Sequence, residues 1–267
     1  MSAAQSAPSF AGKVALVAGA SRGIGAVTAR AFAEAGAAVV LGARDERALE
    51  EVAESIRSAG GRALAVSTDV GDEASMKRLV QSAVDTYGRL DAAFNNATDG
   101  PRPAPLAEID AADFDRGIRA NIRGTFLGMK YQIPAMLRTG GGAIVNMASW
   151  AGLNGFDGLS AYVAGKAGII GLTKVAALDY ADQGIRVNVV APGPILTHHL
   201  ERAGQEVQRQ AALATPMRRI GRSEEVADAV LWLSSDRSSF ITGVTLPIDG
   251  GQYAGLKPPR TSGPGMD

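Results

Sequence analysis

The chain has 267 residues, of which 46% are hydrophobic and 20% charged, so it can bury a substantial core. Lys and Arg together number 27, as do Asp and Glu, so no net charge favours nucleic acid or an anionic membrane as partner. With no cysteine and only two histidines, disulfides, thiolate chemistry and a histidine-rich metal site are excluded. We therefore expect no metal. No uncharged apolar run is long enough to span a membrane, and residues 1–10 lack the basic and apolar regions of a signal peptide, so we expect no membrane span and a cytoplasmic location.

Short apolar runs alternate with helical patterns along the chain. We predict strands at 14–18, 39–41, 63–66, 90–94, 144–147, 185–190 and 244–248, and helices following most of them. Apolar strands without polar alternation, each followed by a helix, are typical of a parallel sheet covered on both faces. The predicted fold is therefore α/β: a Rossmann-type doubly wound parallel sheet of about seven strands with helices on both faces.

No composition break divides this pattern, so residues 12–256 are expected to form one domain. Residues 1–11 and 257–267 are rich in Ala, Ser, Pro and Gly and are predicted to be flexible tails. In a doubly wound sheet the ligand lies beyond the carboxyl ends of the strands. Functional residues should therefore follow the strands directly.

A glycine-rich turn follows the first predicted strand and opens the first helix, with the sequence Gly19-Ala20-Ser21-Arg22-Gly23-Ile24-Gly25. Glycines there let the backbone approach a pyrophosphate, and the free N–H groups of a helix start bind anions. The spacing differs from the commoner Gly-x-Gly-x-x-Gly fingerprint, and a glycine turn alone is often a plain connector. At the first strand-to-helix junction of such a sheet it predicts dinucleotide binding.

The end of the second strand separates NAD from NADP, because an acid there binds the ribose 2′-hydroxyl of NAD. Ala43 occupies that position and Arg44 follows it, with Arg22 in the glycine turn nearby. Two guanidinium groups suit a 2′-phosphate, so we predict NADP, with NAD as the alternative. Asp45 is the counter-candidate for the ribose, although its role as a helix N-cap is favoured.

Tyr162 and Lys166 lie four residues apart in a predicted helix that starts near Ser160, so they share one helix face. An ammonium beside a phenol favours the phenolate and suits the phenol to acid–base work. Ser149, at the end of the fifth strand, could donate a hydrogen bond to a substrate oxygen. Alone, such a pair is more often a solvated helix face.

Several motifs occur together in chain order: Gly19-x-x-x-Gly23-Ile24-Gly25, Asp69-Val70, Asn95-Asn96-Ala97, Asn121, Ser149, Tyr162-x-x-x-Lys166 and Pro192-Gly193. Over about residues 10–255 they resemble the single-domain, classical type of short-chain dehydrogenases/reductases. The resemblance implies that Tyr162 is the general acid/base and that Lys166 holds the nicotinamide ribose and lowers the pKa of Tyr162. It also implies that Ser149 orients the substrate oxygen and that Asn121 holds a water linked to Lys166.

The same resemblance implies further cofactor-binding residues. Asp69 would bond the adenine amino group with Val70 beside the ring, and Asn95 would lie near the adenosine half. The other expected contacts are Asn96, Ala97, Pro192, Gly193, Ile195 and Thr197. Two alternatives stay open: Asn121 could bond only a nearby backbone carbonyl, and Asp69 could cap a helix, although Asp72 suits that role better.

Two positions depart from the family pattern. Ala18 replaces the usual threonine before the first glycine, which removes a hydroxyl that braces the turn, so we expect weaker order there. Thr98 replaces the usual glycine after Asn95-Asn96-Ala97 and adds bulk beside the cofactor ribose.

Mostly apolar residues are predicted to line the substrate pocket: Ser149, Trp150, Leu153, Phe156, Leu159, Tyr162, Leu196 and Leu200. His198 and His199 fall in an expected mobile lid, where surface or lid packing is favoured over a proton relay or metal site. Helix 160–180 is apolar on more than one face, which predicts a homodimer or homotetramer.

The predicted function is an NADP-dependent oxidoreductase that moves a hydride between nicotinamide and a carbonyl or secondary alcohol, such as a ketone, aldehyde or 3-oxoacyl-like compound. The alternative within the family is an NAD-dependent alcohol dehydrogenase. From a different class, the alternative is a non-catalytic dinucleotide sensor or scaffold, which need not keep Ser149, Tyr162 and Lys166 together.

Overall fold

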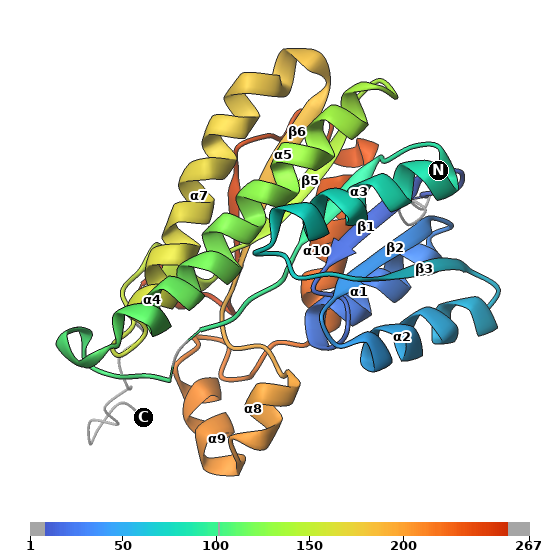
Figure 1. Ribbon diagram of the computed structural model, residues 1–267. Helices are drawn as coiled ribbons and strands as arrows, with labels where there is room; N and C mark the ends of the chain where they lie inside the picture. The colour runs from blue at the N-terminus through green and yellow to red at the C-terminus, as the bar shows by residue number, and fades with distance from the viewer. Residues whose placement is uncertain (1–8, 101, 256–267) are drawn as a thin grey trace, which may run out of the picture.

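The computed structural model describes residues 9–100 and 102–255 (Figure 1). Within them a seven-stranded parallel sheet runs in the order β3-β2-β1-β4-β5-β6-β7. Its strands are β1 (Val14–Ala18), β2 (Ala38–Ala43), β3 (Arg62–Ser67), β4 (Ala92–Asn95), β5 (Gly142–Met147), β6 (Ile185–Pro192) and β7 (Thr245–Ile248). The predicted fold class and all seven predicted strand regions are confirmed. The strand order reverses between β1 and β4, so a ligand crevice is expected at their carboxyl ends.

Helices cover both faces of the sheet (Figure 1). One face carries α1 (Gly23–Glu34), α2 (Glu46–Ser58) and α10 (Ser223–Ser234), and the other α3 (Glu73–Tyr87), α5 (Gly124–Leu137) and α7 (Ser160–Tyr180). Shorter helices are α4 (Ala111–Ile118), α6 (Trp150–Leu153), α8 (His198–Arg202) and α9 (Gln205–Leu213). Single 3₁₀ turns lie at Leu106–Glu108, Ala181–Gln183, Asp236–Ser238 and Gln252–Ala254.

The core follows from the alternation of side chains along each strand. Leu16 and Val40 face the layer of α3, α5 and α7, whereas Val17 and Leu41 face α1, α2 and α10. Because both faces are covered, these strands have no polar side and read as continuous apolar runs. Phe10 corrects one predicted boundary: placed by prediction in the tail 1–11, it is buried 5.0 Å from the Phe32 ring centroid. The rest of both predicted tails, residues 1–8 and 256–267, lies outside the described residues.

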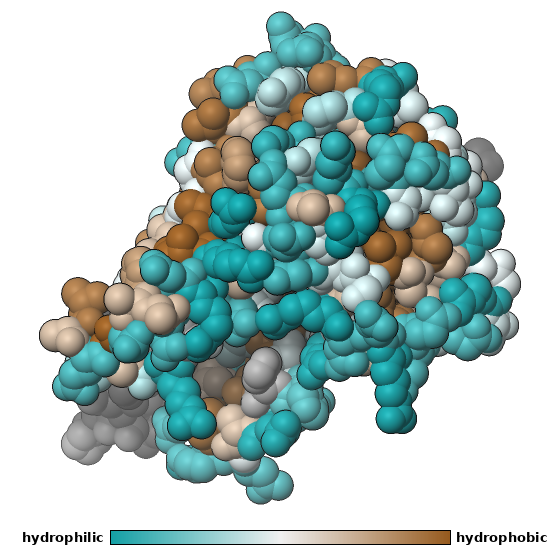
Figure 2. Space-filling model, viewed as in Figure 1, coloured by the Kyte–Doolittle hydropathy of each residue, from teal (hydrophilic) through white to brown (hydrophobic). Residues whose placement is uncertain are grey.

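The stretch Ser160–Gln183, which includes α7, is long and apolar enough to cross a membrane by length and composition alone. Ile169, Thr173 and Ala177 are nevertheless buried against the sheet and its neighbours, so α7 is a core helix of this domain. Its outer face is different, because Val175 and Leu178 are 55% and 83% exposed. Figure 2 shows hydrophobic residues gathered along the edge of the molecule over α7.

The helical segment between β4 and β5 is interrupted. A π turn, Arg119–Arg123, joins α4 to α5 and carries the fully buried Asn121. Two glycines of α7 let that helix lie close to the turn: a Cβ on Gly165 would lie 2.8 Å from the Asn121 Cβ, and one on Gly168 2.3 Å from the Ile122 Cδ1. The π turn is therefore continuous with α4 and α5 and packs directly against α7.

A buried polar network joins the two central strands to the helices above them. The Asn95 side chain exchanges hydrogen bonds with Gln132, at 2.8 and 3.0 Å, and donates to Asn146 Oδ1 at 2.9 Å. Asn146 in turn donates to the Thr173 hydroxyl at 2.9 Å. The Asn95 side chain thus points into this network beneath α5, and its expected place near the adenosine half stays a prediction.

Substituting Asn146 with Val should destabilise the protein by about 2–4 kcal/mol, because Asn95 and Thr173 each lose a buried hydrogen-bond partner. Urea unfolding followed by circular dichroism measures this. The control is Gln81→Ala, which removes an exposed bond to Asp85 and should change stability by less than about 0.5 kcal/mol. Equal effects of the two substitutions would contradict the role of the network.

Candidate active site

The glycine turn and the end of β4 are in direct backbone contact. Gly19 has a φ of +88°, and a Cβ there would lie 2.6 Å from the Ala97 nitrogen. A Cβ on Gly25 would lie 2.0 Å from the Gly19 oxygen, which also accepts a hydrogen bond from Asn96 Nδ2 at 2.8 Å. No larger residue fits either glycine position, so the turn can bring bare backbone to a ligand.

The N-terminus of α1 has free donors. Its N-cap, Arg22, makes no side-chain capping bond, and the first turn contains no acidic residue. A cavity of about 360 Å³ lies beside this end, with a lining that includes Ser21, Arg22, Gly23, Leu196, Thr197 and Ser223. Uncapped N–H groups with a partial positive charge beside an open cavity fit a pyrophosphate.

The turn is also braced without the threonine that the family usually has at position 18. The Gly42 oxygen of β2 accepts hydrogen bonds from Gly19 N at 2.7 Å and Ala20 N at 3.2 Å. Backbone bonds to the neighbouring strand thus brace the turn without a hydroxyl at position 18. The expectation of weaker order there stays a prediction.

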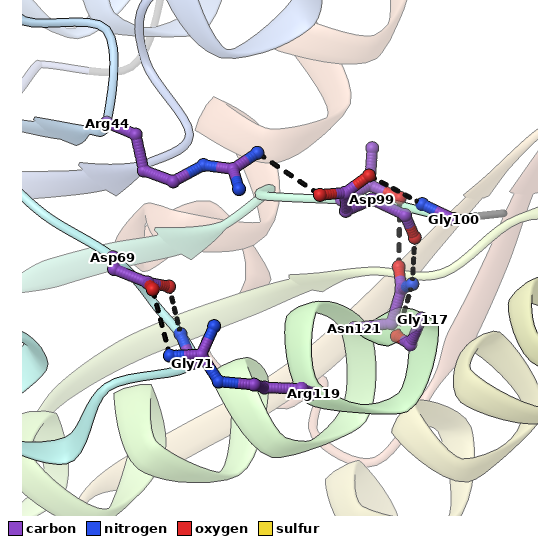
Figure 3. A network of polar contacts seen from close by, with 9 residues as sticks. Arg44, Asp69, Gly71, Asp99, Gly100, Gly117, Arg119 and Asn121 are labelled. Atoms are coloured by element: carbon purple, nitrogen blue, oxygen red, sulfur yellow. Dashed lines mark hydrogen bonds and ion pairs between the residues drawn. The ribbon is translucent and has the colours of Figure 1, made fainter. Parts of the chain in front are cut away.

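Both arginines predicted to hold a 2′-phosphate already pair with carboxylates. Arg22 Nη2 lies 2.6 Å from Asp45 Oδ2, and Arg44 Nη2 lies 3.2 Å from Asp99 Oδ2 (Figure 3). Asp45 also accepts a bond from Ala48 N at 3.1 Å, which confirms it as the N-cap of α2. The two positive charges were predicted from the sequence, whereas their pairing with these carboxylates was not.

Asp69 follows β3 and lies at the same edge of the sheet. Its carboxylate accepts from Gly71 N and from Arg119 Nη2, both at 2.9 Å (Figure 3). Burial alone would raise the pKa of Asp69, but the bonds from Arg119 and Gly71 outweigh it and lower that pKa. Asp72, and not Asp69, caps α3 by accepting from Ser75 N at 2.7 Å, as predicted.

Ser149 and Tyr162 are brought together beyond the end of β5. Ser149 is the N-cap of α6, where its Oγ accepts from Ala151 N at 3.2 Å. Burial raises the pKa of Tyr162, and a hydrogen bond with the Ser149 side chain partly opposes that rise. The phenol is therefore held neutral, with its proton available to an acceptor.

Lys166 lies one helical turn after Tyr162 and is only 1% exposed. Its Nζ donates to the Met147 oxygen at 2.9 Å and lies 5.5 Å from the centre of the Tyr162 ring. Burial lowers the pKa of Lys166 from 10.5 to about 7, because a charged ammonium loses its hydration there. Burial dominates the pKa of both groups here and disfavours both charges, so the expectation that Lys166 lowers the pKa of Tyr162 stays a prediction.

Asn121, in the π turn, makes hydrogen bonds with both its amide nitrogen and its amide oxygen. Its Nδ2 donates to the Gly117 oxygen at 2.8 Å and to the Asp99 oxygen at 2.6 Å (Figure 3), and its Oδ1 accepts from the Thr98 hydroxyl at 2.9 Å. Asn121 therefore bonds backbone carbonyls, as the alternative held, and a side-chain hydroxyl as well, and its expected water-holding role stays a prediction. The Thr98 hydroxyl, expected only as bulk beside a ribose, is a hydrogen-bond donor to a predicted catalytic residue.

The predicted substrate residues divide into two groups. Trp150 and Phe156 meet edge to face with ring centroids 6.4 Å apart, and Phe156 and Leu196 are 51% and 40% exposed. Leu153, in contrast, packs on the buried cluster of Ala148, Ile169, Val189 and Ala191. Ile195, predicted to touch the cofactor, is 8% exposed and its side chain belongs to the core near α10.

Val70 and Gly193 follow the ends of β3 and β6. Val70 packs against α5, where a Cβ on Gly124 would lie 2.9 Å from the Val70 Cγ2. Gly193 N donates to the Ile248 oxygen at 3.0 Å, which fixes the Pro192-Gly193 turn to β7.

The predicted lid consists of α8 and α9, which stand apart from the sheet (Figure 1). Of the predicted substrate residues, Leu200 lies in α8, and Leu159 is the N-cap of α7. His198 is exposed, as the surface-packing interpretation expected.

Comparisons with known proteins agree with this geometry. A family model described as enoyl-(acyl carrier protein) reductase matches residues 19–252. The cis-4-hydroxycyclohexanecarboxylate dehydrogenase of Sinomonas cyclohexanicum is 45% identical over 245 residues, which cover 92% of this chain and 98% of that protein. The cyclohexanol dehydrogenase of Acinetobacter sp. strain SE19 is 42% identical over 241 residues, which cover 90% and 95%. A solved structure of 7α-hydroxysteroid dehydrogenase with NADH and 7-oxo glycochenodeoxycholic acid has a TM-score of 0.86 and 34% identity, covering 91% of this chain and 95% of that one.

The chain therefore belongs to the short-chain dehydrogenase/reductase family, as its motifs predicted. It is an NAD(P)-dependent oxidoreductase of that family, and its relatives act on alcohols and carbonyl compounds. The alternative of a non-catalytic sensor or scaffold is not supported, because these named relatives are dehydrogenases.

The buried amine of Lys166 should make stability depend on pH. With its pKa at about 7 when folded and 10.5 as the ordinary value, the unfolded chain binds more protons between these limits. The cost of burying the ammonium is thus complete below pH 7 and is removed as the pH rises towards 10.5, with a limiting slope of about 1.4 kcal/mol per pH unit. Urea unfolding from pH 6 to 9.5 should therefore show the wild type gaining stability relative to Lys166→Met above pH 7. A difference between the two proteins that stays constant would contradict the low pKa.

Proposed function

We propose that the chain transfers a hydride between NADP and the carbonyl or secondary alcohol of a small molecule. The observation that carries this proposal is the meeting of Ser149, Tyr162 and Lys166 at the sheet edge that also holds the glycine turn. A hydrogen-bonded phenol beside an amine suits proton transfer, and an uncapped helix start suits a dinucleotide pyrophosphate.

The bound nicotinamide would supply the hydride at its C4 atom. In our proposal the hydroxyls of Ser149 and Tyr162 donate hydrogen bonds to the carbonyl oxygen, where negative charge develops during reduction, and Tyr162 gives up its proton. Lys166 would hold the nicotinamide ribose, and Asn121 would keep the π turn next to it in place. For the reverse reaction the same groups would accept the proton of the alcohol.

The cofactor contacts we propose keep to the strand ends. The pyrophosphate would lie on the turn formed by Gly19, Ser21, Arg22, Gly23, Ile24 and Gly25. The adenosine half would contact Arg44, Asp69, Val70, Asn96 and Ala97, and the nicotinamide half Pro192, Gly193 and Thr197. Ile195 would contribute only its backbone, since its side chain is in the core.

NADP is favoured over NAD by Ala43 and Arg44. Ala43 offers no carboxylate to a ribose 2′-hydroxyl, and the Arg44 side chain is 67% exposed, so it can turn towards a phosphate. The NADH in the related hydroxysteroid dehydrogenase structure keeps NAD as the alternative. Titration with NADPH and NADH tests the proposal, and an affinity for NADH tenfold or more above that for NADPH would overturn it.

A ring-bearing alcohol or ketone is the proposed substrate class. Two of the most similar relatives carry cyclohexanol and hydroxycyclohexanecarboxylate in their names. The Trp150 and Phe156 rings and the exposed Leu196 offer apolar surface for such a ring beyond Ser149. A cytoplasmic location stays a prediction.

Replacing Tyr162 with Phe should lower turnover with cyclohexanone and NADPH by about 10²–10⁴-fold, because general acid catalysis contributes that much. The affinity for NADPH, measured by fluorescence titration, should change less than about twofold. Tyr253→Phe, which alters an exposed tyrosine of the last 3₁₀ turn, is the control and should keep its activity. Full turnover in the Tyr162 variant would end the proposal.

We also propose that the exposed apolar face of α7 forms a contact in a homodimer or homotetramer. Introducing a charge by Leu178→Glu should shift the protein to smaller species in sedimentation velocity at micromolar concentration, since a buried unpaired charge is costly. Wild-type protein that sediments as a monomer under the same conditions would refute the contact.

A further inference from the structure

The ion pair between Arg44 and Asp99 crosses from one strand end to another. Arg44 directly follows β2, and Asp99 lies four residues after the end of β4 (Figure 3). The two residues are 55 positions apart in sequence, and Arg44 Nη2 lies 3.2 Å from Asp99 Oδ2. The pair therefore spans the carboxyl ends of three adjacent strands, β2, β1 and β4.

Asp99 is held in place by its backbone and by its own carboxylate. Its main-chain oxygen accepts from Asn121 Nδ2 at 2.6 Å, and Asn121 is fully buried. The Thr98 hydroxyl, on the preceding residue, donates to Asn121 Oδ1 at 2.9 Å. The other carboxylate oxygen, Oδ1, accepts from Gly100 N at 2.8 Å. The negative charge is thus anchored to a buried part of the protein, whereas Arg44 is a long and largely exposed side chain.

We propose that Asp99 is a specificity-determining residue that weakens binding of the 2′-phosphate of NADP relative to the 2′-hydroxyl of NAD. This inference rests on the proposed function in one respect, which is the assignment of Arg44 to the ribose 2′ position. A phosphate must take the Arg44 guanidinium from Asp99, or share it. The fixed carboxylate then stays close to the phosphate and repels it.

The effect should be modest. The side chains of Arg44 and Asp99 are 67% and 28% exposed, and exposed pairs contribute little because water and salt screen them. We expect about a threefold to tenfold change in the dissociation constant of NADPH, equivalent to about 0.6–1.4 kcal/mol. NADH lacks the phosphate, so its affinity should change much less.

Of the two carboxylates that pair with Arg22 and Arg44, Asp99 is the one that can be substituted without disturbing a helix cap. Asp45, the partner of Arg22, caps α2 by accepting from Ala48 N, so its loss would disturb a helix as well as a charge. In Asp99→Asn the side-chain oxygen can still accept from Gly100 N, and the main-chain oxygen can still accept from Asn121. The substitution removes the negative charge and the acceptor that pairs with Arg44, because Oδ2 is replaced by an amide NH₂ group.

The test is fluorescence titration of NADPH and of NADH with wild type, Asp99→Asn and Arg44→Gln. Asp99→Asn should tighten NADPH binding about threefold to tenfold and change NADH binding by less than about twofold. The charge-matched control is Asp85→Asn, an exposed residue near the end of α3, which should leave both affinities unchanged.

Three outcomes separate the claims. If Arg44→Gln leaves NADPH binding unchanged, the assignment of Arg44 to the 2′ position fails, and the inference about Asp99 with it. If Arg44→Gln weakens NADPH binding while Asp99→Asn does not tighten it, the inference about Asp99 alone is overturned. A wild type that prefers NADH contradicts the proposed cofactor, yet NADPH binding that tightens selectively in Asp99→Asn would still support the inference.

Discussion

The close backbone contact between the glycine turn and the end of β4 is the constraint on which the candidate site depends. Gly19 and Gly25 have no room for a Cβ, and Asn96 fixes the turn by a hydrogen bond to the Gly19 oxygen. This contact brings the first and fourth strand ends together where the strand order reverses. The polar residues that follow Asn96, Thr98 and Asp99 among them, are placed by the same contact.

Burial determines the direction in which the pKa values of Tyr162 and Lys166 shift. In water a tyrosine and a lysine would titrate near pH 10, but here burial raises the pKa of Tyr162 and lowers that of Lys166 to about 7. The two groups are thus brought towards neutral forms that can exchange protons and hydrogen bonds. Ser149 tempers this shift, because its bond to the phenol favours the phenolate.

Much of this architecture could be predicted from local sequence. Apolar runs predicted all seven strands because a doubly covered parallel sheet has no polar side, and Asp45 and Asp72 were predicted as caps because capping is a local bond. The Arg44–Asp99 pair could not be predicted, because it joins loops 55 residues apart. The π turn escaped prediction since one additional residue per turn barely alters apolar spacing. The pKa directions depended on burial, which follows only from packing.

The π turn at Arg119–Arg123 makes the helix pair α4–α5 sensitive to its exact residue count. A π turn takes up one residue more than an α-helical turn, so deleting one residue here would restore regular winding with little rotation of α5. Gln132 would keep its place beside Asn95, but Asn121 would lose the wide turn in which it reaches both Gly117 and Asp99. The additional residue thus positions Asn121 and leaves the rest of the helix in register, so length changes should be tolerated in the loops on either side far better than within these five residues.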